Sequence, residues 1–175
     1  MITRLKRSPG IYVVGFMAAG KTTIGKALAG QLGWTFADLD DDIEAGARRS
    51  ISEIFETEGE AAFRRLEKEA LRGRVQAIER GSPTVLALGG GAYVQPGNFE
   101  LVRENGITIW LDCSLDTVKQ RVVAATHRPL ARDPQQFEQL YAQRREAYQR
   151  ADYRIEIVSD DPSVAVAAVL QLPIF

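Results

Sequence analysis

The chain has 175 residues, of which 45% are hydrophobic and 26% charged, and its formal net charge is -1. That length suits one domain, and a charge so close to zero supplies no basic field of the kind that attracts nucleic acid. The lone cysteine, Cys113, excludes a disulfide framework, and no apolar run approaches the roughly 18 residues of a membrane span, so we expect a cytoplasmic protein without a nucleic-acid or membrane partner.

Short apolar runs alternate along the chain with longer segments of helical periodicity. The first half predicts a strand at 11–15, a helix at 23–32, a strand at 34–38, a helix opened by a capping box at 50–53, a helix at 60–80 and a strand at 84–88. The second half predicts a strand at 107–111, helices around 115–123 and at 134–150, a strand at 153–158 and a helix capped by Asp161 with Pro162 at its first position. This alternation predicts one α/β domain, 1–175, whose parallel sheet is covered by helices on both faces and binds ligands at the carboxyl ends of its strands.

A glycine-rich loop lies between the first predicted strand and the first predicted helix. Residues 15–22, GFMAAGKT, fit the pattern G-x-x-x-x-G-K-[ST]. Backbone N–H groups of such a loop point at phosphate oxygens, Lys21 adds a positive charge and the Thr22 hydroxyl is a ligand for Mg²⁺. The alternative is a glycine-rich turn with an exposed lysine. Ala18 stands where many kinases of this kind carry a further glycine, so alanine is strained if the position needs a positive φ.

Four aspartates follow the second predicted strand. We expect Asp38 and Asp40, two residues apart on extended chain, to point the same way into the cleft beside the phosphate loop. One carboxylate can hold Mg²⁺, and the other can accept a proton from a substrate hydroxyl. The alternative is a solvated acidic turn that caps the next helix, which is our interpretation of Asp41 and Asp42.

Two arginines lie on helix faces that otherwise read as buried. Arg144 falls on the apolar stripe of the 134–150 helix, and Arg64 adjoins Phe63 with Glu67 one turn further on. A charge on a buried face needs a partner, and a bound carboxylate suits the guanidinium because two parallel hydrogen bonds can form. The alternatives are an internal salt bridge and a side chain that reaches out to solvent.

Two further segments are candidates for the site. Arg128 lies in residues 124–135, which we predict to connect two helices and to act as a lid that excludes water. The alternative is an ordinary exposed loop. The triplet Gly89, Gly90 and Gly91 follows the third strand and lets the backbone come close to a ligand, or else forms only a tight turn.

Together these segments resemble the shikimate kinase family. GFMAAGKTT, DLDDDIE, SISEIFETEGEAAFRRLE, LALGGGA, RPL and AQRREAY occur in the order and spacing of that family, over about residues 11–162. The resemblance implies a three-layer P-loop NTPase fold with a five-stranded parallel sheet and a lid. It also implies that ATP, with Mg²⁺, phosphorylates the 3-hydroxyl of shikimate in aromatic amino acid biosynthesis.

The same resemblance implies a role for each matching residue. The catalytic residues would be Lys21, Asp40, as the base that also binds substrate hydroxyls, and Arg128, as the lid arginine. The nucleotide would be bound by Ala18, Ala19, Gly20, Lys21, Thr22, Thr23, Arg121, Arg128 and Pro162. Shikimate would be bound by Asp40, Phe63, Arg64, Glu67, Gly89, Gly90, Gly91 and Arg144. The metal would be held by Thr22 and, less directly, by Asp38.

Two departures from the family pattern are present, and three rival functions stay open. The segment 159–162 lacks an arginine that some members carry near the adenine, and RREAY lacks their proline and leucine, so Arg145 competes with Arg144. The nearest rival is another small-metabolite kinase of the same fold, such as a gluconate kinase. The others are a nucleotide switch, disfavoured because no N-K-x-D segment is present, and an inactive regulator, disfavoured by the retained site residues. We expect a monomer because no long apolar surface helix stands out.

Overall fold

The computed structural model describes residues 10–126 and 133–174. The strands there are β1 (Gly10–Val14), β2 (Thr35–Asp38), β3 (Thr84–Ala87), β4 (Ile107–Asp112) and β5 (Tyr153–Glu156). The helices are α1 (Lys21–Leu32), α2 (Leu39–Ala47), α3 (Ile51–Glu58), α4 (Glu60–Glu79), α5 (Asn98–Asn105), α6 (Leu115–Thr126), α7 (Pro134–Tyr148) and α8 (Pro162–Leu170).

The strands form one parallel sheet in the order β2-β3-β1-β4-β5. Near its carboxyl end, β1 places Val13 opposite Ala87 of β3 and Ile109 of β4. Asp38, the last residue of β2, lies opposite the same Ala87. The segments that leave β1, β2 and β3 therefore meet at one edge of the sheet, which is where ligands of such sheets bind.

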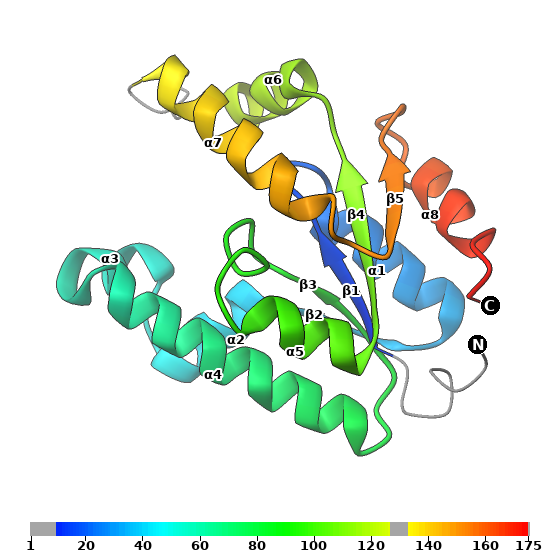
Figure 1. The fold of residues 1–175 in the computed structure, drawn as a ribbon, viewed down its shortest axis with the longest axis horizontal. Coiled ribbons are helices and arrows are strands. Elements are labelled where there is room, and N and C mark those ends of the chain that lie inside the picture. The colour runs from blue at the N-terminus through cyan, green and yellow to red at the C-terminus, as the bar shows by residue number, and fades with distance from the viewer. Residues whose placement is uncertain (1–9, 127–132, 175) are drawn as a thin grey trace.

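Helices cover both faces of the sheet, as the sequence predicts. In Figure 1, α1 and α8 lie together on one face, and α5 lies with α4 on the other, while α7 crosses near the carboxyl ends of the strands. The central strands are buried along their whole length, which explains why they read as continuous apolar runs and not as alternating ones. The predicted three-layer fold with a five-stranded parallel sheet is confirmed.

The predicted elements are present, with ends that differ by at most three residues. Ser50 begins α3 by accepting a hydrogen bond from the Glu53 N–H at 3.1 Å, and the Asp161 carboxylate caps α8 through the Ser163 N–H at 2.9 Å. Cys113 is buried, and burial raises the pKa of its thiol.

Helix α5 was not predicted, and helix α2 was expected only within substrate-binding helices at about 40–80, with no bounds of its own. Helix α2 begins directly after Asp38, within the acidic segment that we expected to be extended. Helix α5 is only eight residues long and follows Gly97, whose N–H is held by the Glu100 carboxylate at 3.0 Å. Its few apolar residues provide too short a period to recognise. No helix within the described ranges has both the length and the hydrophobicity needed to cross a membrane.

Candidate active site

The loop between β1 and α1 has the geometry of a phosphate cradle. Gly15 and Gly20 have φ values of 154° and 99°, and a Cβ on Gly15 would lie 2.8 Å from the Leu111 carbonyl oxygen. No side chain caps the N-terminus of α1. The N–H groups of its first turn are therefore available to an anion, where the helix dipole also favours negative charge.

Ala18 adopts the left-handed conformation, with φ 61°. The strain expected if this position required a positive φ is therefore present. Arg121 of α6 supports the residue, because its Nη1 donates to the Ala18 carbonyl oxygen at 3.0 Å. The Nη2 of Arg121 donates to the Asp160 carboxylate at 2.9 Å. Arg121 thus connects the phosphate loop to the segment that precedes α8 and Pro162.

Replacing Ala18 by glycine is expected to raise the free energy of unfolding by about 0.5–1 kcal/mol, because glycine tolerates a positive φ without steric strain. Thermal unfolding should show a melting temperature about 2 °C higher. Ala27→Gly is the matched control: Ala27 is exposed within α1, and its replacement should lower stability by about 1 kcal/mol. A lower melting temperature for Ala18→Gly would show that strain at this position is not relieved by glycine.

Lys21 lies over its own loop, close to the two aspartates. Its Nζ donates to the carbonyl oxygens of Gly15 and Phe16, both at 2.9 Å. Burial lowers the pKa of Lys21 to about 8, against the opposing effect of Asp40 and Asp38. Because a buried cation is most stable beside a full negative charge, a phosphate in this loop would relieve the desolvation of Lys21.

The two aspartates reach the site by a geometry that the sequence analysis did not predict. Asp38 is extended and its Oδ1 accepts from the Asp40 N–H at 2.9 Å, so Asp38 is the N-cap of α2 and Asp40 lies in the first helical turn. The expectation that both lie on extended chain is wrong, because the cap bends the chain immediately after Asp38. The other oxygen of Asp38, Oδ2, accepts from the Thr22 hydroxyl at 2.7 Å. Burial, and then the charge of Asp38, raise the pKa of Asp40.

The glycine triplet is where the candidate substrate residues converge. A Cβ on Gly89 would lie 2.8 Å from Asp40 Oδ1, and one on Gly91 would lie 2.6 Å from Arg64 Nη2. A Cβ on Gly90 would lie 2.9 Å from Arg144 Nη1 and 3.7 Å from the Met17 N–H nitrogen of the phosphate loop. Any side chain at these three positions would displace a charged group, so the triplet is more than a tight turn.

Arg64 is oriented by its neighbours on α4. Its Nη1 donates to both carboxylate oxygens of Glu67, at 2.9 and 3.1 Å, as we expected from their spacing. Glu67 is only 1% exposed, and the Arg64 guanidinium lies 5.1 Å from the centre of the buried Phe63 ring. The Nε of Arg64 is buried and has no hydrogen-bond partner among the described residues. The internal salt bridge therefore exists but leaves one donor unused.

Arg144 and Arg145 point to different parts of the molecule. Arg144 lies against Gly90 and Gly91, and none of the ion pairs found among the described residues includes it. Arg145 instead pairs with the buried Asp112 at the end of β4. Of these two consecutive arginines, Arg144 is the one that lies at the glycine triplet.

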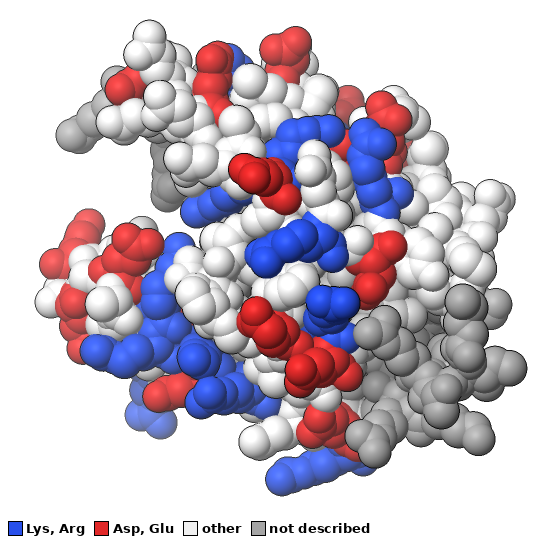
Figure 2. Space-filling model, viewed as in Figure 1, with Lys and Arg blue, Asp and Glu red and all other residues white. Residues whose placement is uncertain are grey.

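One part of the predicted site lies outside the described residues. Arg128 and the centre of the predicted lid fall within 127–132, which the structure does not describe. Residues 124–126 belong to α6 and residues 134 and 135 begin α7, so the connection between these helices is shorter than predicted. Figure 2 shows an indentation between α7 and the α3–α4 pair, with basic side chains on both sides of it.

Sequence reasoning missed Tyr148, which lies on the same helix as Arg144, one turn further on. Tyr148 is 1% exposed, yet its hydroxyl donates to the Gly90 carbonyl oxygen and also contacts Arg144. Burial raises the pKa of this phenol to about 12. The spacing of four residues from Arg144 on one helix face was the available signal.

A parallel sheet in this strand order, a phosphate loop after β1 and carboxylates beside that loop define a P-loop kinase that acts on a small molecule. A family model described as shikimate kinase matches residues 17–172. The chain belongs to the shikimate kinase family.

Individual relatives agree with this assignment. A shikimate kinase of Cereibacter sphaeroides is 42% identical over 159 residues, which are 89% of this chain and 77% of that protein. One from a Sulfurihydrogenibium species is 38% identical over 161 residues, 91% of this chain and 95% of that protein. A solved structure of shikimate kinase from Acinetobacter baumannii in complex with shikimate is 35% identical, with a TM-score of 0.85 over 98% of this chain and 96% of that chain. A gluconate kinase is therefore not favoured.

Proposed function

We propose that this chain transfers the γ-phosphoryl group of ATP to the 3-hydroxyl of shikimate. The observation that carries the proposal is the convergence of Asp40, Arg64 and Arg144 on three consecutive glycines next to the phosphate loop. Two guanidinium groups and one carboxylate suit a ring that bears a carboxylate at one end and hydroxyls at the other. Membership of the shikimate kinase family and a relative in complex with shikimate support the same substrate.

Each end of the substrate has its own binding residues in this proposal. Arg64, oriented by Glu67, and Arg144, supported by Tyr148, bind the carboxylate from α4 and α7. The buried Arg64 Nε, which has no partner in the described residues, is available as an additional donor. Phe63 supplies an apolar wall, and the glycine triplet lets the ring approach the backbone closely.

The nucleotide is bound by the phosphate loop and the start of α1, with Ala18, Ala19, Gly20, Lys21, Thr22 and Thr23 around its phosphates. Thr22 and Asp38 offer hard oxygen ligands, which suit Mg²⁺ coordinated mainly by phosphate and water. No group of three or more metal-binding side chains occurs in the described part of the chain, which fits an ion held in that way. Bound there, Mg²⁺ would neutralise charge on the phosphates. Arg121 and Pro162 are proposed to enclose the adenine, and Arg128 to complete the lid.

Phosphoryl transfer depends mainly on alignment and charge neutralisation. Lys21, released from its contacts with Gly15 and Phe16, would stabilise negative charge on the phosphoryl group. Asp40, whose pKa is raised by burial, would accept the proton of the attacking hydroxyl. Arg64 and Arg144 would hold the ring so that this hydroxyl points toward the phosphate loop.

Steady-state assays of ATP with shikimate, gluconate and nucleoside monophosphates test the proposal directly. Turnover is expected with shikimate only, because the other acceptors do not combine a ring carboxylate with the hydroxyls that Asp40 binds. Greater activity with gluconate or with a nucleoside monophosphate would contradict the assignment. Omitting Mg²⁺ in the presence of a chelator is expected to abolish turnover.

Replacing Arg144 by alanine is expected to weaken shikimate binding by roughly 2–3 kcal/mol, because the shikimate carboxylate loses a charged hydrogen-bond donor. Isothermal titration of the purified variant with shikimate measures this. Arg65→Ala is the matched control, since Arg65 is exposed and lies one residue from Arg64. Unchanged shikimate affinity in Arg144→Ala would count against the clamp.

The proposal includes a single catalytic domain that acts as a cytoplasmic monomer. Light scattering of the purified protein tests the oligomeric state, for which a mass near 19.3 kDa is expected.

A further inference from the structure

Asp112, at the carboxyl end of β4, is a buried carboxylate held by two arginines. It is 5% exposed and accepts from Arg145 Nη2 at 3.0 Å and from Arg154 Nε at 2.7 Å. Both guanidinium groups also lie over the Trp110 ring, at 4.9 and 5.6 Å from its centre. Arg145 belongs to α7 and Arg154 to β5, so one carboxylate joins a helix and an edge strand to β4.

Arg145 and Arg144 are consecutive residues of α7, which links their orientations. Neighbouring side chains on an α-helix point about 100° apart, because each turn holds about 3.6 residues. With Arg145 fixed on Asp112, the adjacent Arg144 is directed at Gly90 and Gly91. A rotation of α7 that released Arg145 would carry Arg144 away from the triplet.

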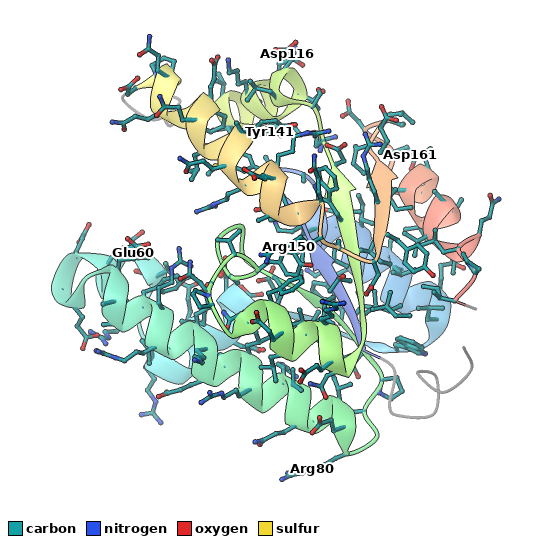
Figure 3. The ribbon with its side chains drawn as sticks, in the orientation of Figure 1. Glu60, Arg80, Asp116, Tyr141, Arg150 and Asp161 are labelled. Atoms are coloured by element: carbon teal, nitrogen blue, oxygen red, sulfur yellow. The ribbon has the colours of Figure 1, made fainter. Side chains whose placement is uncertain are left out.

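Aromatic residues of α7 hold the helix on both sides of Arg144. Tyr148, one turn after Arg144, is buried and its hydroxyl donates to the Gly90 carbonyl oxygen. Tyr141, labelled in Figure 3, is one turn before Arg145, and its hydroxyl donates to the Cys113 carbonyl oxygen at 2.6 Å. The Phe16 ring of the phosphate loop lies edge-on to Tyr141 at 5.2 Å. These neutral contacts lie about one turn from Arg144 on either side, whereas the Arg145 pair is a charged contact, roughly twice as strong as a neutral one, and lies directly beside Arg144.

We propose that the Arg145–Asp112 ion pair is a positioning device for shikimate binding: it fixes the rotation of α7 and so directs Arg144 at the substrate carboxylate. This inference rests on the proposed function, in which Arg144 binds that carboxylate. Neither Arg145 nor Asp112 touches the substrate in this scheme, and both act through Arg144.

The structure supplies a matched control for the device. Arg154 binds the same carboxylate and covers the same Trp110 ring, but it lies on β5 and not on α7. Methionine at either position removes one positive charge and keeps an apolar stem over Trp110. In each variant the other arginine remains on Asp112, so no buried charge is left alone and both variants should fold.

The test compares Arg145→Met, Arg154→Met, Arg144→Met and the double variant of Arg144 and Arg145 in steady-state kinetics, with melting temperatures as a check on folding. Arg145→Met is expected to raise KM for shikimate about tenfold, with kcat and KM for ATP unchanged. Arg154→Met should leave KM for shikimate unchanged, and Arg145→Lys should recover part of the loss. Because Arg145 acts through Arg144, the double variant should match Arg144→Met alone.

Two results would overturn the positioning role while leaving the proposed function intact. One is an unchanged KM for shikimate in Arg145→Met although Arg144→Met raises it. The other is an equal rise in Arg145→Met and Arg154→Met, which would indicate general loosening around β4. An unchanged KM in Arg144→Met itself would instead refute the clamp in the proposed function, and the positioning role with it.

Discussion

Replacing Lys21 by methionine is expected to lower kcat at least about a thousandfold while the fold stays intact, because a fixed cation at the transferring phosphate contributes a factor of this order. Lys21 is the cation at the centre of the loop, held by the Gly15 and Phe16 carbonyl oxygens. A coupled assay with ATP and shikimate measures the loss. Lys26→Met is the control, because Lys26 is exposed on the same helix and should leave kcat unchanged.

The same variant should be no less stable than the natural chain. Burial lowers the pKa of Lys21 from 10.5 to about 8, so between these pH values the unfolded chain binds more protons and stability rises with pH. Below pH 8 the lysine is charged in both states, and the folded state bears the whole penalty of burying it. Methionine removes that penalty, so denaturation at pH 7 should show an equal or greater free energy of unfolding for Lys21→Met. Near-normal turnover in Lys21→Met would contradict the phosphate-binding role assigned to Lys21 and its loop.

Replacing Asp40 by asparagine is expected to lower kcat by about 10²–10⁴, the usual contribution of a positioned general base. Asparagine retains the shape of the side chain but cannot accept the proton. Asp41→Asn is the control, since Asp41 is the next residue of α2 and is exposed. Equal turnover in Asp40→Asn and the natural chain would show that the hydroxyl needs no base at this position.

The pH profile offers a second measurement on Asp40. Its pKa is raised above the ordinary 3.8, first by burial and then by the charge of Asp38. A base must be deprotonated to act, so kcat/KM should decline as the pH falls through this raised pKa. The stability effect has the opposite sign: a carboxyl whose pKa is raised by folding destabilises the folded chain at neutral pH. Asp40→Asn should therefore lose activity without losing stability.

Local sequence patterns predicted much of the fold, because the start, the end and the buried face of an element depend mainly on residues within that element. The phosphate loop needs glycines and a lysine at set spacings, Ser50 and Asp161 cap the helices that follow them, and the buried strands read as apolar runs. Helix α5 escaped prediction because it is short and its N-cap residue, Gly97, has no side chain that signals a helix start. The family resemblance supplied the substrate, which the patterns alone left open among small metabolites.

The tertiary structure decided which charged groups meet. The sequence left Arg145 as a competitor of Arg144 on the same helix, and only the packing of α7 places Arg144 at the glycine triplet and Arg145 on Asp112. Asp40 reaches the triplet from a helical turn that the pattern of aspartates did not reveal. By itself the sequence determined the loop, the caps and the parallel sheet, since these follow from short-range geometry. Long-range packing determined the substrate side of the site, because a buried charge takes its direction from residues that lie far away in the chain.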